Sequence, residues 1–178
     1  MILLLDMDGV LADFEGGFVR AWTARYPGVP PLPPGERRHF SIRFDYPEHQ
    51  RDMVQAVYHA EGFFRSLTPL PGALAAVHEL ASMGHDLRIC TSPLRQYRHC
   101  VGEKYEWVDE HLGPEFVNRM IVTRDKTLVR GDVLVDDNPA IAGAQPPAWT
   151  HVVFDQPYNR QVAGPRMTWA DWRDVLAP

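Results

Sequence analysis

The opening stretch constrains the fold of this chain more than any other. Residues 2–5 (Ile-Leu-Leu-Leu) form a short apolar run, which is typical of a strand buried on both faces of a parallel sheet. Asp6 and Asp8 follow at the carboxyl end, where open α/β sheets bind ligands, and Gly9 allows the turn that lets both face one point. Because two carboxylates this close repel each other, we expect a site with a metal ion, a shared proton, or both.

The same letters also occur in calcium-binding loops and in plain surface turns. In an EF-hand loop the glycine comes later and a glutamate closes the loop, at the position where this chain has Gly17. A surface turn is seldom preceded by a run of aliphatic residues. We therefore interpret the stretch as part of a catalytic site.

Composition narrows the class of protein. With 178 residues, 45% hydrophobic and 23% charged, the chain can form one well-packed domain with a small insert. The net charge of −5 argues against binding a nucleic-acid polymer, although not against binding a single nucleotide. No apolar run approaches the ~20 residues of a membrane span, and the early aspartates do not fit a signal peptide. Two cysteines, Cys90 and Cys100, cannot make a disulfide framework, so we expect a cytoplasmic protein.

Short aliphatic strands alternate with helices along most of the chain. We expect strands at 2–5, 85–90, 120–123, 133–135 and 151–154, and helices at 14–26, 47–62, 71–84, 97–112 and 169–176. In the helix over 97–112, Tyr105, Val108 and Leu112 are expected to share one face. This alternation predicts an α/β fold with a doubly wound parallel sheet. Residues 15–70 contain no strand, so they are expected to form a helical cap over the carboxyl edge, with 1–14 and 71–178 as the core.

Polar residues follow four of the expected strands. They are Asp6 and Asp8, then Thr91 and Ser92, then Thr123-Arg-Asp-Lys126, and finally Asp136 and Asp137. Each group alone has an ordinary explanation as a helix cap, a solvated lysine or a turn. In this order on alternating α/β structure, they predict one site at one edge of the sheet.

These motifs resemble the haloacid dehalogenase (HAD) superfamily and, within it, the 5'(3')-deoxyribonucleotidases. The superfamily match consists of Asp6-Met-Asp8-Gly-Val10, Thr91, Lys126 and Asp136-Asp137. The closer match is carried by residues 6–18, 89–93, 104–108, 122–127 and 168–172, which span nearly the whole chain. The resemblance implies a HAD-like core with the cap inserted after the first strand.

The resemblance also implies roles for the strand-end residues. Asp6 would attack phosphorus and form an aspartyl-phosphate, and Asp8 would protonate the leaving oxygen and then activate water. Mg²⁺ would be held by Asp6, the backbone carbonyl of Asp8 and Asp137. The phosphoryl oxygens would be held by Thr91, Ser92 and Lys126, and Asp136 would orient Lys126 or a metal-bound water.

Aromatic residues of the expected cap are candidates for contact with a base. In the resembling enzymes, aromatics at the positions of Phe14, Phe40, Tyr58 and Phe64 surround the base, with Tyr58 replacing a tryptophan. The alternative is that most of them form the small core of the insert. The chain departs from the family pattern at Ser41 and Ile42, where a tryptophan and a small apolar residue are expected, and at Asn138, where arginine is frequent.

The predicted function is a Mg²⁺-dependent phosphomonoesterase that acts on (deoxy)ribonucleoside monophosphates. Another small phosphate ester, such as a sugar phosphate, is the nearest alternative, and a mutase is a weaker one. A non-catalytic nucleotide-binding module is the alternative from a different class, but it would lack Asp6 or Asp8. The expected partner is a small nucleotide, with no nucleic-acid polymer and no membrane, and a homodimer is left open.

Overall fold

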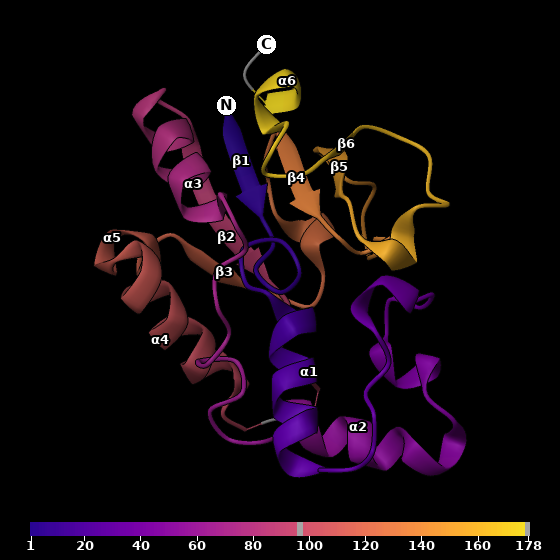
Figure 1. Cartoon of the computed structure of the whole chain (residues 1–178). Helices are drawn as coiled ribbons and strands as arrows, with labels where there is room; N and C mark the ends of the chain where they lie inside the picture. Colours follow the sequence, from indigo (N-terminus) through magenta and orange to yellow (C-terminus); the bar gives the residue numbers. More distant parts are fainter. Residues whose placement is uncertain (96–97, 177–178) are drawn as a thin grey trace.

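A central parallel sheet organises the molecule. The computed structural model describes residues 1–95 and 98–176, and its sheet has six strands in the order β3-β2-β1-β4-β5-β6, all parallel (Figure 1). The strands are β1 (Ile2–Leu5), β2 (Asp86–Thr91), β3 (Met120–Val122), β4 (Val133–Asp136), β5 (Thr150–Phe154) and β6 (Arg166–Met167). The predicted α/β fold is confirmed, and β1 lies between β2 and β4, where a continuous apolar strand is expected.

In the part of the chain that the structure describes, six α-helices accompany the sheet, five of them in the connections from β1 to β2 and from β2 to β3, and one after β6. They are α1 (Phe14–Arg25), α2 (Arg51–Tyr58), α3 (Ala73–Ser82), α4 (Cys100–Leu112), α5 (Pro114–Val117) and α6 (Trp172–Leu176). The first of them begins where Asp13 caps it, by accepting a hydrogen bond from the backbone N–H of Gly16 at 2.8 Å. Among the described residues, no helix is long and apolar enough to cross a membrane.

The two faces of β1 contribute to two apolar clusters. Leu3 and Leu5 belong to the larger cluster, which also includes residues of α3, α4 and α6. Leu4 points to the other face and packs in a smaller cluster with Trp149. This alternation is the period of two that a strand imposes on its side chains, and it explains why every residue of the central run is apolar.

Several predicted boundaries are wrong. The helix predicted over 47–62 is a 3-10 turn at Glu48–Gln50 followed by α2, which ends at Tyr58 before the left-handed Gly62 (φ 85°). The helix predicted from Tyr97 begins at Cys100, and Tyr97 itself lies outside the described residues. The last helix begins at Trp172 rather than at Trp169, whose indole N–H donates to the carbonyl of Val10 at 2.6 Å.

The segment between β1 and α3 lies beyond the carboxyl end of β1, with α1 and α2 as its helices (Figure 1). Its two connections to the sheet run side by side. The N–H of Asp13 donates to the carbonyl of Thr68, and the N–H of Leu70 donates to the carbonyl of Leu11, each at 2.8 Å. This pairing fixes where the segment enters and leaves the core.

Candidate active site

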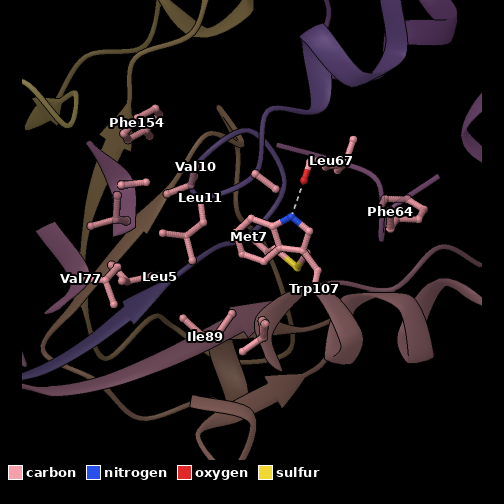
Figure 2. Close-up of a cluster of buried hydrophobic side chains, with 14 of the residues drawn as sticks. Leu5, Met7, Val10, Leu11, Phe64, Leu67, Val77, Ile89, Trp107 and Phe154 are labelled. Atoms are coloured by element: carbon pink, nitrogen blue, oxygen red, sulfur yellow. Dashed lines mark hydrogen bonds between the residues drawn. The ribbon is translucent and has the colours of Figure 1, made fainter. Parts of the chain in front are cut away.

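The turn after β1 brings Asp6 and Asp8 to the same side of the chain. The N–H of Asp6 donates to the carbonyl of Val135 at 2.9 Å, which continues the pairing with β4. Gly9 then adopts a φ of 77°, a left-handed conformation that favours glycine. Met7, between the two aspartates, points the opposite way and is buried beside Leu11 (Figure 2). The alternation therefore separates core packing from the site.

A buried lysine holds the first aspartate. The ammonium of Lys126 donates to Oδ1 of Asp6 and to Oδ2 of Asp136, each at 2.5 Å, and all three residues are buried. Burial lowers the pKa of Lys126, but the two carboxylates outweigh it and raise that pKa, so the amine stays charged. Burial raises the pKa of Asp6, and the charge of Lys126 opposes that rise.

Three carboxylates form a compact cluster beside this lysine. One oxygen from each of Asp6, Asp136 and Asp137 lies within 4.8 Å of the others. Burial, together with the neighbouring charges of Asp136 and Asp6, raises the pKa of Asp137 well above its usual value. A bound cation would relieve that repulsion, and carboxylate oxygens are the ligands that Mg²⁺ prefers. The residues present therefore fit a divalent metal ion.

Asp8 is paired with a lysine that has no role among the sequence predictions, although this lysine belongs to the 104–108 segment of the family resemblance. The ammonium of Lys104 donates to Oδ2 of Asp8 and to Oγ1 of Thr91, each at 2.7 Å, and to the carbonyl of Ser92 at 3.0 Å. Its side chain is only 1% exposed. Burial raises the pKa of Asp8, and the charge of Lys104 opposes that rise.

A signal for this lysine exists in the sequence. Lys104 stands four residues after Cys100 and three before Trp107, both fully buried, so it occupies the inward face of α4. The prediction that Tyr105 shares the buried face with Val108 and Leu112 is wrong, because Tyr105 is 36% exposed. A cation on the apolar face of a helix needs a buried partner, and Asp8 supplies it.

One oxygen of Asp8 remains unpaired among the described atoms. Oδ1 is buried and has no hydrogen-bond partner, whereas Oδ2 is bound by Lys104. A buried polar atom without a partner is costly in a folded protein. Such an oxygen is free to exchange a proton with a ligand in the cavity beside it.

All the residues that were given a role in the predicted site line one cavity of about 330 Å³, whereas Thr123 and Asp125, from the same strand end as Lys126, are not part of its wall. The polar ones are Asp6, Asp8, Thr91, Ser92, Lys126, Asp136 and Asp137, and the aromatic ones are Phe14, Phe40, Tyr58 and Phe64. The three positions that depart from the family pattern, Ser41, Ile42 and Asn138, also line it. Polar groups and aromatic rings thus share a single cavity, as a phosphorylated ligand with an apolar part would require.

The aromatic residues form two separate parts of the cavity wall. The ring centroid of Phe14 lies 6.3 Å from that of Tyr58 and 6.5 Å from that of Phe64. Phe40 lies elsewhere, with its ring 6.0 Å from that of Tyr158 and its side chain 46% exposed. Phe64 and Tyr58 are largely buried, so they contribute to the packing of the insert as well as to the cavity.

Fold and site together define a hydrolase of the HAD class, with an Asp-x-Asp turn at the end of the central strand facing a buried lysine and an acidic pair. Solved structures support that class at the level of the fold. A HAD family hydrolase from Deinococcus radiodurans superposes with a TM-score of 0.60 at 18% identity, over 99% of this chain and 94% of that chain.

Comparison of sequences gives the family. A model of the 5' nucleotidase, deoxy (pyrimidine), cytosolic type C family (NT5C) matches residues 1–177. A Bordetella bronchiseptica protein described as a 5'(3')-deoxyribonucleotidase is 53% identical, covering 99% of this chain and 96% of its own length. The human 5'(3')-deoxyribonucleotidase of cytosolic type is 47% identical, over 98% of this chain and 92% of its own. The chain belongs to the NT5C family and is a phosphoric monoester hydrolase, which confirms the resemblance.

Proposed function

We propose that this enzyme dephosphorylates (deoxy)ribonucleoside monophosphates through an aspartyl-phosphate and depends on Mg²⁺. The observation that carries the proposal is the position of Asp6. It is buried at the carboxyl end of β1, in hydrogen-bond contact with Lys126, in a cavity whose wall also includes several aromatic rings. The names of the family and of its relatives support the same substrate class.

The first step is attack by a carboxylate oxygen of Asp6 on phosphorus. A new O–P bond forms while the bond from phosphorus to the sugar oxygen breaks, and Asp8 gives its proton to that departing oxygen. The raised pKa of Asp8 favours the protonated form that this task needs. In the second step Asp8 takes a proton from water, whose oxygen attacks the aspartyl-phosphate and releases phosphate and Asp6.

Cationic and polar groups around Asp6 stabilise the charge that develops on the phosphoryl oxygens. Lys126, Thr91 and Ser92 line the cavity beside Asp6 and are the proposed phosphate-binding residues. Mg²⁺ would be held by Asp6, Asp137 and the carbonyl of Asp8, and when bound it would neutralise negative charge on the substrate. Asp136, which binds Lys126, orients that lysine.

The aromatic part of the cavity is proposed to bind the base, through Phe14, Phe40, Tyr58 and Phe64. A sugar phosphate is the second candidate, because Ser41 presents a small polar side chain to the cavity where the family pattern has a tryptophan. We also propose that residues 15–70 act as a cap that selects the substrate, and that the enzyme works in the cytoplasm, as the cytosolic type of the human relative suggests.

The first test is a panel of phosphate esters with phosphate release as the readout. We expect nucleoside monophosphates to be hydrolysed faster than sugar phosphates, and we expect exhaustive dialysis against a chelator to abolish release until Mg²⁺ is restored. The Asp6→Asn variant is the matched control, because its amide has the same shape but cannot attack. Phosphate release by Asp6→Asn at the parent rate would contradict the aspartyl-phosphate route, and a preference for sugar phosphates would favour the second candidate.

A further inference from the structure

A short segment after β5 is built against Asp137. This is the 3-10 turn η5 (Pro157–Asn159), which follows Gln156. The side-chain amide of Asn159 donates to the backbone carbonyl of Asp137 at 2.8 Å, and the amide of Gln156 donates to the carbonyl of Gly9 at 2.7 Å. The segment therefore fixes both the backbone of Asp137 and the turn that carries Asp8.

Tyr158 extends this support to the side chain of Asp137. Its hydroxyl donates to Oδ2 of Asp137, and the tyrosine is 3% exposed. Gly9 lets the pair lie against the turn, because any β-carbon at this position would clash with Oδ2 of Asp137 and crowd the hydroxyl of Tyr158. The hydroxyl of Tyr158 thus fixes one oxygen of a carboxylate that also belongs to the cluster with Asp6 and Asp136.

The ring of Tyr158 is held in turn by the segment between α1 and α2. The guanidinium of Arg37 lies over that ring, 4.4 Å from its centroid, and Arg37 is 4% exposed. Arg37 is itself fixed by ion pairs with Glu15 and Asp45. It also donates to the carbonyl of Phe40 at 2.7 Å, so it holds the backbone of a proposed base-contacting residue.

We infer that Tyr158 is a positioning residue that orients Asp137 for a divalent cation, and that Arg37 holds Tyr158 in place from the cap. The inference rests on the proposed Mg²⁺ dependence. A hydrogen bond from a neighbouring group commonly orients a metal-binding carboxylate and tunes its affinity. Here the chain of contacts runs from Phe40 and Arg37 through Tyr158 to Asp137, so the wall of the cavity and the metal ligand share one support.

The test measures metal binding without turnover. Mn²⁺ serves as the probe, because the electron paramagnetic resonance signal of the free ion is lost on binding, and Mg²⁺ is then added as a competitor. We expect Tyr158→Phe to raise the dissociation constant for Mn²⁺ by about 10–100-fold, the usual effect of removing such a supporting contact. Tyr105→Phe, at an exposed position on α4, is the matched control and should bind as the parent does.

A second variant tests the contact from the cap. Arg37→Lys keeps a cation between Glu15 and Asp45 but loses the planar face over Tyr158, so we expect a loss of affinity of about two- to fivefold, the value of one cation–π contact. If Tyr158→Phe fails to fold, the Mn²⁺ affinity of Arg37→Lys still tests whether Tyr158 positions Asp137. Unchanged Mn²⁺ affinity in the folded variants would overturn the inference and leave the proposed function standing. No bound ion in the parent would overturn both.

Discussion

At the scale of single residues, the site depends on buried charges that compensate each other. Lys126 lies between Asp6 and Asp136, and Lys104 lies between Asp8 and Thr91. Removing one member of such a buried pair leaves the other without a partner, which costs far more than the pair itself contributes. Each lysine therefore keeps its carboxylate partners in a fixed orientation.

We predict that Lys104→Met lowers kcat/KM for a nucleoside monophosphate by about 100-fold or more, because Asp8 loses the contact that orients it for the proton transfer proposed above. Methionine is similar in length and suits the buried position, so the near-ultraviolet circular dichroism should stay that of the parent. Arg65→Met, which removes an exposed cation paired with Glu106, is the control and should leave kcat/KM unchanged. Parental activity in Lys104→Met would mean that Asp8 is held by other contacts.

At the scale of elements, the strands were easier to predict than the helices. A buried parallel strand is marked by its own aliphatic run, as in β1 and β4. β6 and α5 are absent from the predicted elements because they have only two and four residues, too short for a periodic pattern. The residue at which a helix begins depends on contacts between residues distant in sequence, which no local pattern reveals. An example is the hydrogen bond from the indole of Trp169 to the carbonyl of Val10.

The candidate site was predictable in part for the same reason. Residues at strand ends, such as Asp6 and Asp137, meet because parallel strands share an edge. Lys104 comes from the middle of a helix, Tyr158 from a short 3-10 turn and Arg37 from a loop, so the fold is needed before their partners can be named. The spacing of Lys104 from Cys100 and Trp107 marks it as inward-facing, but it does not identify Asp8 as its partner.

The loop between α1 and α2 provides a prediction about substrate choice. Phe40 is half-exposed on the cavity wall, so Phe40→Ala should remove stacking with a base. We expect KM for a nucleoside monophosphate to rise by the factor that corresponds to about 1–3 kcal/mol of lost stacking free energy. Ser41→Trp should lower that KM by adding a stacking surface. A small generic phosphate ester, assayed in parallel, is expected to change much less because it makes no such contact. Equal changes for both substrates in both variants would show that this loop does not contact a base.

At the scale of the whole molecule, the insert and the sheet share one apolar cluster. Phe18, Trp22 and Val54 of the insert belong to the same buried cluster as Leu3 and Leu5 of β1. The indole of Trp107 on α4 joins the two parts, because its N–H donates at 2.6 Å to the carbonyl of Leu67, in the segment that returns to the core (Figure 2). A continuous core of this kind is expected to unfold as one cooperative unit.

We therefore predict that Trp22→Ala in the insert lowers the stability of the entire molecule. Trp22 is fully buried, and truncating a buried tryptophan costs about 3–5 kcal/mol in the free energy of unfolding. Of the five tryptophans in the chain, the other four, Trp107, Trp149, Trp169 and Trp172, lie outside residues 15–70. The tryptophan fluorescence of this variant therefore comes from the sheet and its helices, and of its four sources Trp107 also contacts residues 15–70, through Leu67.

During unfolding in urea, the midpoint of the fluorescence transition should lie at a lower urea concentration in Trp22→Ala than in the parent. The fluorescence transition should also coincide with the loss of far-ultraviolet circular dichroism. Met83→Ala, which truncates a side chain that is 49% exposed at the end of α3, is the control and should shift the transition by less than about 0.5 kcal/mol. If the insert unfolded independently, Trp22→Ala would leave the main fluorescence transition in place, with an early change only from Trp107, and would split the circular dichroism curve into two steps. That result would replace the single cooperative unit by a core that stays folded while its cap is open.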